Sequence, residues 1–72
     1  MKFTILIEKS TDGWFVGQIE EVPSAISQGK TIEECIANVI DALYEIFAAN
    51  RELIEIEYQG KSVIKESVQL AG

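Results

Sequence analysis

The feature that most constrains this chain is a junction within residues 26–34, where an extended stretch stops at Gly29 and a helical pattern begins after Thr31. Glu34 follows Thr31 by three residues, which is the spacing of a capping box. In that motif the Thr31 hydroxyl accepts from the N–H of Glu34, and the Glu34 carboxylate reaches back to the N–H of Thr31. Gly29 can adopt turn conformations that residues with a Cβ resist. The junction therefore predicts a strand, a turn and a long helix in succession.

The length of 72 residues predicts one domain spanning residues 1–72, with no internal linker or repeat. A core this small supplies only a few kcal/mol of net stability, so self-association is expected. Hydrophobic residues make up 47% of the chain, which indicates a globular protein rather than a disordered one. No apolar run approaches the roughly 20 residues that span a bilayer, and the N-terminus does not read as a signal peptide. We therefore expect a cytoplasmic protein with no membrane association.

The charge is strongly acidic and unevenly distributed. Twelve acidic residues against six basic ones give a net charge of −6, which disfavours direct nucleic-acid binding because phosphates are bound by clustered Lys and Arg. Residues 31–57 hold seven of the acids and a single base, Arg51. This segment is either an ordinary solvated helix face or a docking face for a basic partner, since complementary charge speeds and selects encounters.

The cysteine and histidine content excludes several kinds of site. With one cysteine and no histidine, the chain cannot form an internal disulfide, a Cys/His zinc site, or a Cys–His or Ser–His–Asp catalytic set. Cys35 flanks the apolar stripe of the helix, which favours packing over a reactive thiol. Glu8, Glu20 and Glu21 are candidate ligands for a divalent metal, but nothing in their spacing requires it. The sequence thus implies no catalytic site, no metal and no cofactor, and we predict a protein that is not an enzyme.

Three short strands are predicted before the helix, at about residues 2–8, 14–19 and 25–28. In the first, Phe3, Ile5 and Ile7 share one face, which is typical of a half-buried strand. Residues 10–13 have the composition of a turn, so the first two strands form an antiparallel hairpin. Gly17, inside the second strand, indicates a bulge or the close approach of another element.

The helix is predicted from Ile32 to about Arg51. Its apolar stripe comprises Ile32, Ile36, Val39, Ile40, Leu43 and Phe47, widened by Cys35, Ala42 and Ile46. Its opposite face comprises Glu34, Asn38, Asp41, Glu45 and Glu52.

The segment after the helix can be interpreted in two ways. Residues 53–58 continue the helical stripe through Ile54 and Tyr58, yet they also alternate at period two. We favour a strand, because Asn50 is a plausible helix stop and β-branched residues increase after it. Residues 63–70 are predicted to form a last extended segment.

These elements predict an α+β fold of the order β-β-β-α-β. It consists of a three-stranded antiparallel sheet with one long helix packed on one face, plus one or two C-terminal strands. One helix covers only one face of the sheet. The other face, or a free strand edge, is then available to a second copy, so we expect a homodimer or higher homo-oligomer.

Several residues together resemble a known family. These are the segments Gly13–Val16 and Ile26–Glu34, the single Pro23, and Asn38 with Asp41-Ala42-Leu43 in the helix. In this context Ser-Gln-Gly-Lys-Thr-Ile-Glu-Glu resembles the HicB-like antitoxin family over about residues 1–50. The family's Pro-x-Leu-Pro-Gly-Cys turn is replaced here by Glu20–Ala25, and no C-terminal DNA-binding segment is expected.

The resemblance implies a fold like a partial double-stranded-RNA-binding domain or a degraded RNase H domain. It also implies neutralisation of a small basic mRNA-cleaving toxin of the HicA type, by covering its RNA-binding face. The candidate partner-binding residues are Trp14, Glu34, Asp41 and Glu45. Trp14 is an equally good candidate for capping the small core. The alternative function is a stand-alone oligomeric domain, structural or regulatory, with no toxin partner.

Overall fold

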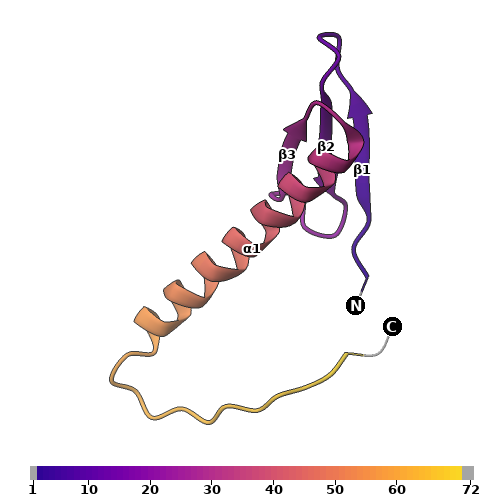
Figure 1. The fold of residues 1–72 in the computed structure, drawn as a ribbon. Helices are drawn as coiled ribbons and strands as arrows, with labels where there is room; N and C mark the ends of the chain where they lie inside the picture. The colour runs from indigo at the N-terminus through magenta and orange to yellow at the C-terminus, as the bar shows by residue number, and fades with distance from the viewer. Residues whose placement is uncertain (1, 71–72) are drawn as a thin grey trace.

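The computed structural model describes residues 2–70 and contains three strands and one long helix. The strands form one antiparallel sheet in the order β1-β2-β3, and the helix lies across one face of it (Figure 1). The predicted α+β class, with a three-stranded antiparallel sheet and one long helix, is confirmed. The elements are β1 (Ile5–Lys9), β2 (Phe15–Ile19), β3 (Ile26–Gly29) and α1 (Ile32–Glu57).

The hairpin between β1 and β2 is closed by local hydrogen bonds in its turn. Gly13 has a φ of 89°, a conformation that residues with a Cβ rarely adopt. The N–H of Trp14 donates to the Asp12 carboxylate at 3.0 Å, and the Ser10 hydroxyl donates to the same carboxylate. These contacts bring Lys9 opposite Phe15 and so set the register of the whole hairpin.

The core lies between β2, β3 and the first half of α1. Ile5 and Ile7 of β1 are partly buried against it, as the alternation of the sequence predicts. Leu6, between them, is exposed on the opposite face of the sheet. The buried hydrophobic side chains are Ile19, Ala25, Cys35, Val39 and Leu43.

The prediction of which helix residues form the middle of the buried face was wrong. Cys35 lies at the middle of the buried face rather than beside it. Ile32, Ile40 and Phe47, predicted to pack on the sheet, are instead substantially exposed. The physical reason is the position of α1, which contacts β3 and β2 and leaves β1 largely uncovered. The helix face turned toward β3 and β2 is therefore the buried one, and the face above β1 is open.

Two glycines permit this close contact between helix and sheet. A Cβ on Gly17 would lie 2.8 Å from Cys35 Sγ, so the predicted close approach is confirmed. A Cβ on Gly29 would lie 2.5 Å from the backbone nitrogen of Cys35. Gly29 does not have a positive φ, so the expected turn conformation is not the reason for this glycine. It is required because the first turn of α1 lies directly against the end of β3.

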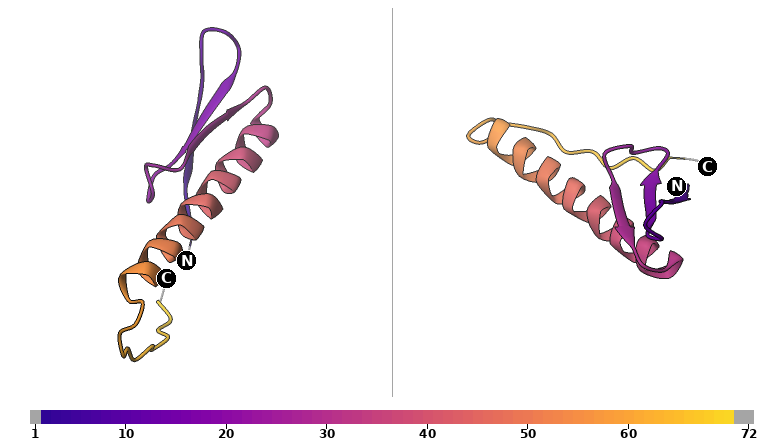
Figure 2. Two further views of the ribbon diagram at one scale, coloured as in Figure 1. Left: turned by 90° about the vertical axis from the view of Figure 1, so that its left-hand side faces the viewer. Right: turned by 90° about the horizontal axis from the view of Figure 1, so that it is seen from above.

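The helix continues past the predicted stop at Asn50, and the strand predicted for residues 53–58 is wrong. Backbone hydrogen bonds within a helix need no second segment, whereas a strand here would need an adjacent sheet edge. The helix ends at Glu57, where the N–H of Tyr58 donates to the Ile54 carbonyl. Gly60, with a φ of 76°, provides the turn that follows. The C-terminal part of α1 extends beyond the sheet (Figure 2).

The last predicted segment, residues 63–70, is extended as expected but does not form the further C-terminal strand. Residues 62–70 are extended but belong to no ladder, since no neighbouring backbone pairs with them. From the end of α1 this tail runs back below the helix, separate from the sheet (Figure 1). Every residue from 47 to 70 is exposed.

Candidate protein-interaction surface

The start of α1 is fixed by its capping residues. Thr31 has extended backbone angles, and its Oγ1 accepts from the N–H of Glu34 at 3.1 Å, as predicted. The reciprocal bond differs by one residue from the prediction. The Glu34 carboxylate accepts from the N–H of Lys30 at 3.3 Å rather than from that of Thr31. The Glu34 side chain is thereby held back over the junction between β3 and α1.

One side of α1 is lined with carboxylates. We call Glu34, Asp41, Glu45 and Glu52 the acidic side of the helix; all four are exposed. Their spacing places them on one side of a helix, and Glu34 and Glu45 are about 16 Å apart along its axis. The chain has six basic residues, and three of them lie over aromatic rings: Lys9, Lys30 and Lys61.

The acidic side is anchored to the sheet by Asn38, which the sequence placed among the solvent-facing residues. Asn38 is half-buried, and its Nδ2 donates to the carbonyl oxygen of Gln28 in β3 at 2.8 Å. That carbonyl lies on the outer edge of the sheet, so the contact blocks part of the free edge of β3. An amide within a row of carboxylates was the available signal, because it can donate to a strand carbonyl and a carboxylate cannot.

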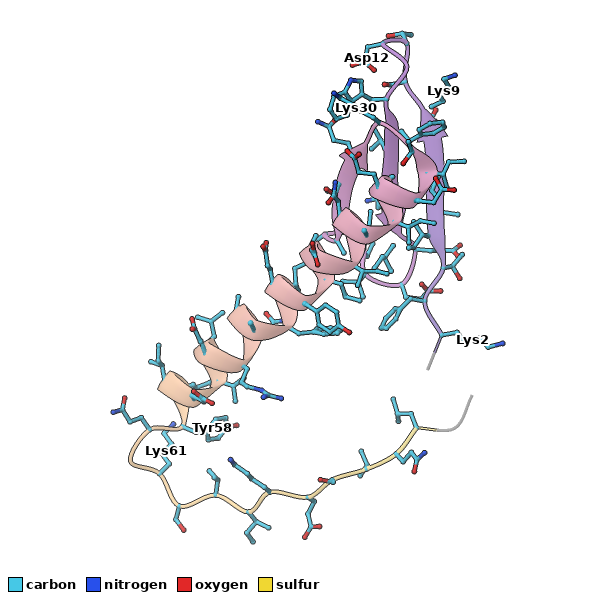
Figure 3. All side chains as sticks on the ribbon, viewed as in Figure 1. Lys2, Lys9, Asp12, Lys30, Tyr58 and Lys61 are labelled. Atoms are coloured by element: carbon cyan, nitrogen blue, oxygen red, sulfur yellow. The ribbon has the colours of Figure 1, made fainter. Side chains whose placement is uncertain are left out.

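Trp14 lies near the start of this surface. It is half-buried, and Lys30 Nζ is 5.5 Å from the centre of its ring. The Lys30 ammonium thus lies over the indole, and its backbone N–H donates to the Glu34 carboxylate. Figure 3 shows Lys30 at the same end of the molecule as Asp12. The structure thus brings Trp14 and Glu34 to the same end of the molecule. Asp41 and Glu45 lie farther along the helix.

The candidate metal ligands are not brought together. The N–H of Glu20 donates to the carbonyl of Thr4, so Glu20 lies at the opposite end of the hairpin from Glu8. Glu21 has a structural role, since its carboxylate accepts from the N–H of Thr4 at 2.7 Å. That bond lowers the pKa of Glu21 below its ordinary value. Within residues 2–70 no group of three Asp, Glu, Cys or His side chains is placed to hold a metal ion.

Cys35 is a packing residue, as predicted. It is fully buried between the helix and β2, and removal from water raises the pKa of its thiol. Because a thiolate is the reactive form, both effects make it inert.

An open groove of about 820 Å³ lies between the end of α1 and the tail. Its lining is mixed, with Ile54, Tyr58 and Ile64 beside Arg51 and Glu55. In the described part of the chain, no helix combines the length and apolar character needed to cross a bilayer.

Comparison with known proteins finds relatives by sequence. A UPF0150 protein of Synechocystis sp. is 34% identical over 56 residues, covering 78% of this chain and 75% of the relative. The chain belongs to the UPF0150 family. A UPF0150 protein of Archaeoglobus fulgidus is 29% identical over 65 residues, covering 90% of this chain and 94% of that one.

A third UPF0150 protein, from Thermoplasma acidophilum, is 37% identical over 43 residues, or 60% of this chain and 62% of the relative. No family model matches the chain, and no solved structure matches it. The Archaeoglobus fulgidus relative is similar in length to this chain, and the names of the UPF0150 relatives state no activity.

Proposed function

We propose that this UPF0150 protein is a non-enzymatic antitoxin of the HicB-like kind, which binds a small basic ribonuclease toxin through the acidic side of α1. The observation that carries the proposal is the placement of four exposed carboxylates along one side of a helix that Asn38 fixes to the sheet. The Ser-Gln-Gly-x-Thr-x-Glu-Glu motif supports the same family. Its residues position the helix and contribute one carboxylate, Glu34, to the surface.

The physical basis of binding would be charge complementarity. A ribonuclease must present a basic surface to bind the phosphates of RNA. The chain carries a net charge of −6, and its acidic side extends over about 16 Å from Glu34 to Glu45, with Glu52 beyond. An acidic ridge of this length competes with RNA for the same basic surface. Inhibition then results from occupying the substrate site and needs no chemistry from the antitoxin.

Co-expression with the product of the neighbouring gene tests this proposal. We expect a small basic protein to co-purify, and its ribonuclease activity to be suppressed in the complex. Asp41→Lys with Glu45→Lys should raise the dissociation constant at least about tenfold, because the two new lysines would then face the basic surface of the partner. The wild-type affinity should also fall as salt increases.

A matched control reverses the same charge elsewhere. Glu8→Lys with Glu20→Lys changes two exposed carboxylates on the sheet and its following loop. We expect the control to bind nearly as tightly as the wild type. If both double variants weaken binding equally, net charge rather than the acidic side governs the interaction. If no basic partner binds, the antitoxin proposal fails.

A second function is favoured by a different observation. The tail and the end of α1 expose large apolar side chains, including Leu53, Ile56 and Ile64. A stand-alone oligomeric domain, structural or regulatory, would cover them without any toxin. It predicts a stable homo-oligomer that captures no second protein when the neighbouring gene is co-expressed.

A further inference from the structure

The chain is far more extended than a compact protein of its size. Its radius of gyration is 16.1 Å, whereas a compact chain of 72 residues has about 11 Å. It exposes 6190 Å², whereas a compact 8.0 kDa monomer exposes about 4,450 Å². The excess of about 1,700 Å² is twice the roughly 800 Å² that each partner contributes to a standard interface. The isolated chain therefore has enough uncovered surface for a stable association.

Part of the uncovered surface is the helix overhang, which we define as residues 48–57. It extends beyond the sheet (Figure 2), and all of its residues are exposed. Leu53, Ile54 and Ile56 are all exposed, and Ile56 is 70% accessible. Leu53 and Ile56 are three residues apart and share one side of the helix, whereas Ile54 points away from Ile56, so the apolar surface of the overhang is broad.

A second part is the tail, residues 62–70. Ile64 is 89% accessible and Val68 83%, and Leu70 is also exposed. In an extended chain, residues at even spacing share one face, so these three side chains lie on one face with Glu66 between Ile64 and Val68. We call this mainly apolar side the apolar face of the tail. Val63, Lys65, Ser67 and Gln69 lie on the other face. One face is thus mainly apolar and the other mainly polar, as in a half-buried strand, with Glu66 and Val63 as the two exceptions.

The third part is the free edge of β1. The Thr4 carbonyl and the Ser10 N–H both bond to the β2 side, at Glu20 and Trp14. Because backbone direction alternates along a strand, the N–H and C=O groups of Ile5 and Ile7 point away from β2. They present unpaired donors and acceptors to any strand that lies alongside.

The space above this edge is apolar as well. α1 lies over β3 and β2, which leaves the side of the helix above β1 open. Ile40 and Phe47 are exposed on that side, and Phe3 packs against Phe47 with ring centres 6.4 Å apart. A strand added beside β1 would place alternate side chains beneath these residues. On the apolar face of the tail, Ile64, Val68 and Leu70 are at the even spacing that this position requires.

We propose that the tail of one chain adds as a strand to the β1 edge of a second copy, in a reciprocal homodimer whose helix overhangs pack together. A chain's own tail could pair with its own β1, but that arrangement would leave the overhang uncovered. The reciprocal arrangement covers the tail, the edge and the overhang at once. It does not depend on the antitoxin proposal, because it uses neither the acidic side nor a second protein.

Light scattering and NMR on the full chain test the proposal. We expect a species of twice the 8.0 kDa chain mass. In a mixture of isotope-labelled and unlabelled chains, the methyl groups of Ile64 and Val68 should show intermolecular contacts to amides of Ile5 and Ile7. A monomer, a dimer with an unpaired tail, or a dimer in which these contacts are intramolecular would each overturn it.

Substitutions in the tail provide a matched comparison. Ile64→Asp with Val68→Asp places two charges on the apolar face and should weaken dimerisation by at least a hundredfold. Ser67→Asp with Gln69→Asp adds the same two charges to the other face and should leave the dimer intact. All four residues are exposed in the chain, so neither variant disturbs the core. Equal effects of the two variants would contradict the assigned face.

Discussion

Gly29 lies so close to Cys35 that a Cβ on the glycine would be 2.5 Å from the Cys35 backbone nitrogen. The other nearest atoms, the Glu34 carbonyl carbon and Cys35 Cα, are at 2.9 and 3.0 Å. All three belong to the first turn of α1, which its N-cap holds in place. The end of β3 and the beginning of the helix are thus in direct backbone contact, and no side chain can rotate to make room.

Gly29→Ala should therefore be strongly destabilising. We expect the free energy of unfolding to fall by about 3 kcal/mol, the upper end of what overpacking usually costs. Urea denaturation followed by circular dichroism measures the change. Gly60→Ala adds the same methyl group where nothing lies within 4 Å, at a φ of 76°. The control should lose about 1 kcal/mol from backbone strain alone. Equal losses would show that the close approach at Gly29 is not the cause.

Gly17 differs from Gly29 because its nearest neighbour is a side chain. A Cβ there would lie 2.8 Å from Cys35 Sγ and 3.0 Å from Val39 Cγ2. We expect Gly17→Ala and Cys35→Ala each to lower the free energy of unfolding by about 1–2 kcal/mol. The double variant should be more stable than the sum predicts by about 1 kcal/mol, because removing the sulfur makes room for the new methyl group.

The control for this cycle uses the other glycine. When Cys35→Ala is combined with Gly29→Ala, the two losses of stability should simply add, since the atoms near Gly29 belong to the backbone. Urea denaturation of the two double variants and their singles gives both coupling energies. Equal coupling in the two cycles would contradict the distinction between the sites.

The sequence predicted the elements whose signals are local. Thr31 with Glu34 marked the start of the helix, and the alternation of Ile5 with Ile7 marked the buried face of β1. The helix end was missed because residues 53–58 fit both periods, and in the structure they continue α1, whose backbone hydrogen bonds need no second segment. The centre of the buried stripe was missed because it depends on where α1 crosses the sheet. Asn38 was missed because its acceptor is in β3, ten residues away.

The N-cap should contribute measurably to stability. The Thr31 hydroxyl satisfies the N–H of Glu34, which has no partner within the helix. We expect Thr31→Ala to lower the free energy of unfolding by about 1 kcal/mol. Thr31→Ser keeps the acceptor oxygen and should stay within a few tenths of the wild type. Thermal or urea unfolding of the three proteins measures this, and an equal loss in both variants would mean that the methyl group, not the hydroxyl, matters.

Stability should fall in acid through two carboxylates that the fold holds ionised. The Ser10 hydroxyl and the Trp14 N–H lower the pKa of Asp12, and the Thr4 N–H lowers that of Glu21. A depressed pKa in the folded state adds stability that is present above the unfolded pKa and is lost as pH falls through the folded one. The loss should therefore begin near the ordinary values of 3.8 and 4.5 and continue below them.

Asp12→Asn with Glu21→Gln should reduce this acid loss, because the variant has no charge to neutralise at either position. The double variant should be less stable than the wild type at neutral pH, and the difference should shrink as the pH falls below these values. Urea midpoints measured across the acid range follow both effects. Glu8→Gln with Glu20→Gln removes the same number of charges from exposed positions and should keep the wild-type pH dependence. If the control flattens the curve equally, general charge repulsion rather than the hydrogen bonds at Asp12 and Glu21 controls acid stability.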